Sequence, residues 1–143
     1  MGLATAGCSH TLSVDAPQAS GAAARACAAL VRALPARVAD QPRRAVDPGP
    51  GYAAAWGDPA IVLRCGVRRP RGLDASASCQ VVDRVGWFIP ETQQTGEPVT
   101  MTTVGRAENV EVRLPAAYFP PATAMVDLAP AVRRTIRELR PCV

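Results

Sequence analysis

Cysteine has the clearest chemistry of the residue types in this chain, because a thiol can form a disulfide, bind a metal ion or carry a lipid. Five occur along the 143 residues, at Cys8, Cys27, Cys65, Cys79 and Cys142. No two of them form a C-x-x-C pair, and the single histidine, His10, lies close to Cys8. Zinc sites need closely spaced pairs of ligands, so we expect no metal site and no cofactor. The pattern favours disulfide formation instead.

The first cysteine predicts a lipid anchor. Cys8 follows the small residues Thr5-Ala6-Gly7, like the end of a bacterial lipoprotein signal, where the cysteine is acylated and becomes the mature N-terminus. Only seven residues precede it, so the basic and apolar parts of such a signal are missing. We favour a lipoprotein with a trimmed start over an ordinary free thiol. Residues 1–10 would then be an anchor segment, and residues 11–143 a single domain.

A second group of interest lies in the stretch "AAAWGDPAIVLRCG", residues 53–66. Trp56 could stack on a sugar or a peptide, Asp58 could accept its hydrogen bonds, and Arg64 could pair with Asp58 or face solvent. These three are the candidate ligand-binding residues. The simpler interpretation is structural. Trp56 then plugs the sheet edge, Gly57 supplies an unusual backbone angle, and Asp58-Pro59 turns the chain into a strand.

Catalytic groupings are scarce. The chain contains no G-x-S-x-G motif, no H-E-x-x-H motif and no glycine-rich phosphate loop. Four carboxylates, Asp58, Asp83, Glu91 and Glu111, could meet in space, as some carboxylates could in almost any domain. We therefore expect no enzyme and no catalytic residue. The alternative is a cell-wall-acting enzyme that uses Asp58 and a carboxylate from a neighbouring strand.

Two segments predict helices by their apolar spacing. Residues 20–34 should form a helix that Ser20 caps and Pro35 ends. Its apolar stripe is Ala23, Cys27, Leu30, Val31 and Leu34. Residues 126–139 should form the other helix, with Asp127 at the N-cap and Pro130 in the first turn. Its stripe is Leu128, Val132, Ile136 and Leu139.

Four segments predict strands by alternation, with residues such as Ile61, Leu63 and Cys65 sharing the core face. They are residues 61–65, 85–89, 99–104 and 110–114, and the last two should form a hairpin. Residues 36–59 are rich in proline and glycine without a period, and we expect a surface connection there. The order of these elements along the chain, helix, four strands, helix, predicts an α+β fold. We expect an antiparallel sheet of about four strands, with an N-terminal and a C-terminal helix packed on one face.

These elements favour one pairing of the four remaining cysteines. Cys27 lies on the helix stripe and Cys65 on the core face of a strand. A disulfide between them would close a loop of about 38 residues and contribute about 3.5–4 kcal/mol. Cys79 would then pair with Cys142. The alternative is a local Cys65–Cys79 link, and the connectivity stays open between the two at this point.

Composition narrows the class of protein further. Hydrophobic residues make up 48% of the chain and aromatic residues only 4%, so the core must be mostly aliphatic. The net charge is +4, the arginines are scattered, and few aromatic residues could stack on bases. Nucleic-acid binders usually combine a basic stripe with such aromatics, so we expect no nucleic-acid partner. No run of 18 apolar residues, the length needed to span a membrane, occurs.

Several motifs together resemble a known family. They are "CSHTLSVDAP", "ARACAALVRALP", "AAAWGDPAIVLRCG", "VGWFIPE" and "MVDLAPAVRRTI". The chain is similar over nearly its whole length to the domain-of-unknown-function 3515 family of actinobacteria, whose members are small secreted or membrane-anchored lipoproteins. The resemblance implies an extracytoplasmic location, a lipid-bearing Cys8, and a Cys27/Cys65 pair. It implies no activity. Cys79 and Cys142 are extra to the family pattern, which supports pairing them with each other.

The expected function is therefore that of an extracytoplasmic, lipoprotein-type binding or accessory module of the cell envelope. It would be anchored to the outer face of the membrane through lipid on Cys8, or secreted. Its partner would be an envelope protein or the cell wall. A structural subunit of a membrane complex is a further candidate.

Overall fold

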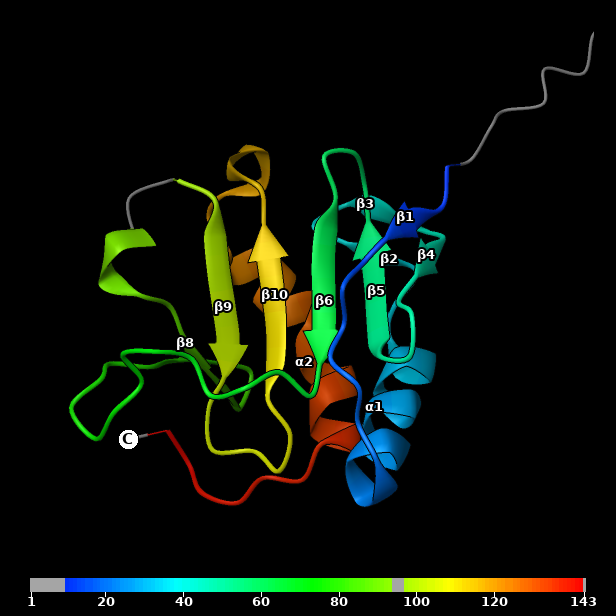
Figure 1. Cartoon of the computed structure of the whole chain (residues 1–143). Helices are drawn as coiled ribbons and strands as arrows, with labels where there is room; N and C mark the ends of the chain where they lie inside the picture. Colours follow the sequence, from blue (N-terminus) through cyan, green and yellow to red (C-terminus); the bar gives the residue numbers. More distant parts are fainter. Residues whose placement is uncertain (1–9, 94–96, 143) are drawn as a thin grey trace, which may run out of the picture.

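The protein is built on one large antiparallel sheet with both helices on the same face (Figure 1). A computed structural model describes residues 10–93 and 97–142. In spatial order the eight strands are β2 (Arg37–Val38), β3 (Gln41–Arg44), β5 (Tyr52–Trp56), β6 (Ile61–Cys65), β10 (Val110–Leu114), β9 (Val99–Thr103), β8 (Val85–Phe88) and β7 (Gln80–Val82). Two short strands, β1 (Leu12–Ser13) and β4 (Val46–Asp47), form a separate parallel pair.

The helices α1 (Gly21–Ala33) and α2 (Ala122–Thr135) pack on each other and on the sheet. Short 3-10 turns, η1 (Glu91–Gln93) and η2 (Ala116–Tyr118), lie in the connections. The core fills the space between helices and sheet. The strand residues expected to face inward, such as Leu63, Met101 and Val112, are fully buried there, so the predicted alternation is confirmed.

The expectation of a four-stranded sheet is wrong, because the main sheet has eight strands and the fold is mostly β. The four predicted strands exist as β6, β8, β9 and β10, and β9 pairs with β10 as expected. The largest error is the segment 36–59, which contains β2, β3, β4 and β5. Its strand β5 is built around three alanines, a residue type depleted in strands. Pairing along β6 and burial, rather than propensity, make it a strand.

The C-terminal helix also differs from its prediction. It begins at Ala122, so Asp127 lies inside the helix and is not its N-cap. The Asp127 carboxylate instead accepts the backbone N–H of Ala39 at 2.9 Å. The helix ends before Ile136, and Leu139, predicted to be buried, is exposed. At the other helix, Ser20 occupies the N-cap position, but its side chain makes no capping hydrogen bond.

The sheet curves around α2. Eight flat strands would span about 34 Å, whereas a helix of 14 residues is about 21 Å long. Both edge strands, β2 and β7, nevertheless contact α2. Asp127 holds the turn between β2 and β3, and Arg133 forms an ion pair of 2.8 Å with Asp83 in the turn between β7 and β8. One helix therefore secures the two edges of the sheet.

Candidate functional site

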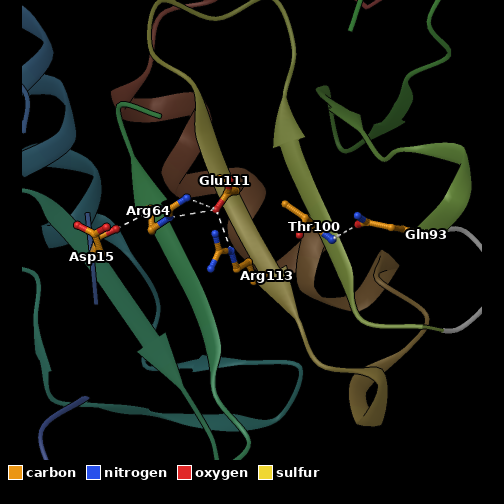
Figure 2. A network of polar contacts seen from close by, with 6 residues as sticks. All are labelled: Asp15, Arg64, Gln93, Thr100, Glu111 and Arg113. Atoms are coloured by element: carbon orange, nitrogen blue, oxygen red, sulfur yellow. Dashed lines mark hydrogen bonds and ion pairs between the residues drawn. The ribbon is translucent and has the colours of Figure 1, made fainter. Parts of the chain in front are cut away.

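The face of the sheet away from the helices carries a row of polar side chains over its central strands (Figure 2). The antiparallel register places Glu111 of β10 directly between Arg64 of β6 and Thr102 of β9. Two residues further along β10, Arg113 lies directly opposite Thr100 of β9. Because residues two apart on a strand share a face, these side chains lie on one face of the sheet, where Thr102 is buried and the other four are at least partly exposed. We call it the open face.

Glu111 is the centre of a charged network on the open face (Figure 2). Its Oε1 atom accepts hydrogen bonds from Nε and Nη2 of Arg64, at 3.0 and 2.8 Å. The Nε atom of Arg113 lies 3.3 Å from the same oxygen. Arg64 also donates from Nη1 to the backbone oxygen of Asp15, at 2.7 Å. One arginine thus joins β6, β10 and the N-terminal segment.

A shallow pocket of about 330 Å³ lies beside this network. Its lining residues are Asp15, Pro17, Arg64, Val67, Arg68 and Glu111. Each of the three side-chain nitrogens of Arg64 already donates a hydrogen bond. Arg68, by contrast, is exposed, and the side chain of Arg113 is 60% exposed. Since Glu111 is held by Arg64 and Arg113, the charges that a ligand would meet here are the exposed Arg68 and Arg113 and the exposed carboxylate of Asp15, a net positive charge. Such a surface can bind an anionic group, and guanidinium groups suit carboxylates and phosphates.

Trp56, the most conspicuous of the predicted ligand-binding residues, is fully buried in the core. Its indole Nε1 donates to the backbone oxygen of Pro35 at 3.0 Å, and the Arg43 guanidinium lies 6.0 Å from the ring centre. Gly57 has a φ of +77°, and a Cβ atom there would come within 2.9 Å of the Gln41 side chain. Trp56 and Gly57 thus pack a corner of the fold.

Asp58 and Arg64 lie at opposite ends of β6. Asp58 is exposed in the turn between β5 and β6, about 20 Å of extended chain from Arg64. Arg64 therefore pairs with Glu111, not with Asp58. The sequence did not single out Glu111 as the partner, because β6 and β10 are adjacent in the sheet but far apart in the chain, with 44 residues between Cys65 and Val110.

The four carboxylates considered for catalysis stand on separate elements. Asp58 follows β5, Asp83 follows β7, Glu91 opens η1 and Glu111 lies within β10. Asp83 and Glu111 are each paired with arginine. In the described part of the chain, no cluster of three or more His, Cys, Asp or Glu side chains could hold a metal ion.

The disulfides are Cys27–Cys65 and Cys79–Cys142, which confirms the favoured pairing and excludes the local Cys65–Cys79 link. The first joins α1 to β6 with a Cα–Cα distance of 5.6 Å, and both of its cysteines are fully buried. The second joins the loop before β7 to the C-terminal segment and is half-buried. Two disulfides indicate an oxidising, extracytoplasmic environment. Cys8, the predicted lipid site, lies outside the described residues.

Comparison with protein families finds a match that covers residues 4–140. The chain belongs to the DUF3515 family. Its members are described as proteins of unknown function, and the resemblance noted in the sequence is thereby confirmed. Comparison of this DUF3515 chain with the curated proteins and with the solved structures finds no match. Among residues 10–93 and 97–142, no helix has the length and apolar character needed to cross a membrane.

We expect the substitution Glu111→Gln to lower the free energy of unfolding of this DUF3515 protein by about 1–2 kcal/mol, between the values typical of exposed and of buried ion pairs. The reason is that Arg64 and Arg113 would keep their charges but lose the carboxylate between them. Urea denaturation measures the effect. Asp83→Asn is the matched control, because its ion pair with Arg133 is more exposed. An equal loss of stability in both variants would contradict the expectation that the less exposed ion pairs of Glu111 contribute more.

Proposed function

We propose that this protein is a non-catalytic binding or accessory module of the cell envelope, tethered to the outer face of the membrane by lipid on Cys8. Support for the compartment comes from the two disulfides. Support for a non-catalytic role comes from the carboxylates considered for catalysis, which stand on separate elements. Two of the residues first considered for binding are not available for it. Trp56 packs the core, and Arg64 and Glu111 hold each other.

The observation that carries the proposal is the charge of the open face. Arg64, Arg68 and Arg113 stand here against two carboxylates, Glu111 and the exposed Asp15, which leaves one positive charge in excess. Arg68 and Arg113 remain exposed. Complementary charge directs partner choice and speeds association more than it adds affinity. The partner that fits this surface is an envelope protein presenting an acidic patch. An anionic cell-wall polymer is the competing partner in the experiment below.

The mass of the native protein, purified from a membrane fraction, tests the location. We expect a chain that begins at Cys8 and carries a diacylglyceryl group. Each disulfide removes two hydrogens, so the mass should also be four hydrogens below that of the fully reduced chain. An unmodified N-terminus, or free thiols at Cys79 and Cys142, would contradict the proposed compartment and anchor.

Site-specific photocrosslinking in intact cells tests the open face. A photoreactive residue in place of Thr100 should give a discrete protein adduct, and Arg68→Glu with Arg113→Glu should abolish it. The control position is Arg134, which is exposed on α2. Equal adducts from both positions, or an adduct that only a cell-wall hydrolase removes, would overturn the protein partner.

Turnover of an envelope substrate that Asp58→Asn abolishes in the folded protein would overturn the non-catalytic assignment.

A further inference from the structure

A cavity lies beside the connection between β9 and β10, away from the turn that holds Asp58. Three segments enclose about 530 Å³: the loop between β6 and β7, the loop between β9 and β10, and residues 136–142, which we call the C-terminal strap. In Figure 1 all three meet at the lower edge of the sheet. The volume is within the range of small-molecule sites, about 300–1,000 Å³.

The walls of this cavity are joined to one another. The backbone N–H groups of Leu139 and Arg140 in the strap donate to the backbone oxygen of Gly105, at 2.7 and 3.1 Å. Gly105 has a φ of +72°, and a Cβ atom there would collide with the Arg140 backbone. The Cys79–Cys142 disulfide links the strap to the loop between β6 and β7. The cavity is therefore preorganised, which lowers the entropic cost of binding.

Positive charge dominates the lining. Arg69, Arg106 and Arg140 line the cavity, against one carboxylate, that of Asp74. Hydrogen bonds from the Ser76 side chain and backbone lower the pKa of the Asp74 carboxyl. Ser76 thus donates twice to this carboxylate, and the nearby charge of Arg69 lowers its pKa further without a direct ion pair among the described residues.

The three arginines differ in how many of their guanidinium nitrogens already donate hydrogen bonds. Arg106 is buried, and its guanidinium donates to the backbone oxygens of Ile136 and Arg84, so it is a fixed charge in the wall. Burial lowers the pKa of this guanidinium, but arginine stays protonated at neutral pH. Arg69 uses only Nε, toward the backbone oxygen of Leu73. Within the described residues, its terminal nitrogens and the whole Arg140 guanidinium have no hydrogen-bond or ion-pair partner.

We propose that this cavity binds a small anionic ligand through a carboxylate or phosphate group held by Arg69 and Arg140. Free guanidinium forks make paired, charge-assisted hydrogen bonds to both kinds of group. The exposed Leu139 side chain, which also lines the cavity, provides an apolar contact for the remainder of the ligand. This site is separate from the open face, and its test does not depend on the partner proposed there.

Titration of the ¹⁵N-labelled full chain with inorganic phosphate, and separately with citrate, tests the site at low ionic strength. We expect saturable shifts at the backbone amides of Gly105, Ala107 and Arg140 with at least one of the two anions. Arg69→Gln with Arg140→Gln should weaken binding by about tenfold or more. The control, Arg25→Gln with Arg32→Gln on the exposed side of α1, removes the same charge and should leave the affinity unchanged.

Three results would overturn the site: no saturable shift with either anion, equal weakening in both double variants, or the same shifts with sodium chloride at matched ionic strength. The disulfide gives a further check. Cys79→Ser with Cys142→Ser should leave the protein folded by circular dichroism but weaken binding, because the strap is then free to move away. Unchanged affinity in that folded variant would overturn the preorganised cavity.

Discussion

We expect the double substitution Cys27→Ala with Cys65→Ala to lower the free energy of unfolding by about 4 kcal/mol, the largest effect of any change considered for this protein. The disulfide closes a separation of 38 residues, and the chain-entropy model assigns about 4 kcal/mol to a loop of that length. Domains of this size are stable by only about 5–15 kcal/mol. Losing this one bond therefore removes a large share of the total.

The position of the bond in the fold adds to its effect. Cys27 and Cys65 are both fully buried, between α1 and the centre of the sheet. Alanine at both positions removes the two sulfur atoms and leaves space that the neighbouring side chains fill only partly. By contrast, Cys79–Cys142 joins surface segments, so its removal leaves no comparable space in the core.

Urea denaturation of the oxidised proteins measures the loss. The control is the same comparison after unfolding and refolding in a strong thiol reductant, where neither protein has a cross-link. The difference between wild type and variant should then shrink to the packing contribution. A loss below about 1 kcal/mol in the oxidised proteins would contradict the proposed role of the bond.

The second expected result is that Trp56→Phe destabilises the protein by about 3 kcal/mol, and Trp87→Phe by about 1 kcal/mol. Both tryptophans are fully buried, so the loss of ring volume is similar. The indole of Trp56 donates to the Pro35 backbone oxygen, and phenylalanine would leave that oxygen without its donor. The indole nitrogen of Trp87 has no partner in the described part of the chain, so phenylalanine removes an unsatisfied buried group there.

Urea denaturation gives both values, and in each variant the fluorescence of the remaining tryptophan reports the transition. Since the two substitutions are chemically identical, each is the control for the other. Equal losses, or a larger loss for Trp87→Phe, would show that the Pro35 contact contributes little. That outcome would also weaken the structural interpretation of the Trp56-Gly57 corner.

Local patterns in the sequence predicted much of the core. The alternation along residues 61–65, 99–103 and 110–114 identified three strands and their buried faces, because side-chain direction in a strand depends only on position parity. Helical spacing placed Cys27 on a buried stripe in the same way. Together these faces favoured the Cys27–Cys65 bond over a local Cys65–Cys79 link, and the structure confirms it. The family also follows from motifs within the chain.

Local patterns could not predict which distant segments of the chain lie side by side. The alanine strand β5 exists because β6 pairs with it on one side and β3 on the other. Glu111 meets Arg64 only because β10 lies beside β6. In the same way, Asp127, predicted as a helix cap, holds the turn after β2 because the sheet curves around α2.

The sequence by itself indicated most of the buried faces, favoured the cysteine pairing that the structure contains, and carried the motifs of the family. These properties depend on local periodicity and residue type. Only the tertiary structure decided that eight strands form one curved sheet, that Trp56 packs a corner while Arg64 pairs with Glu111, and that the C-terminal strap closes a cavity lined by arginine. Those features depend on strand order and curvature, because they join residues that no short-range pattern relates.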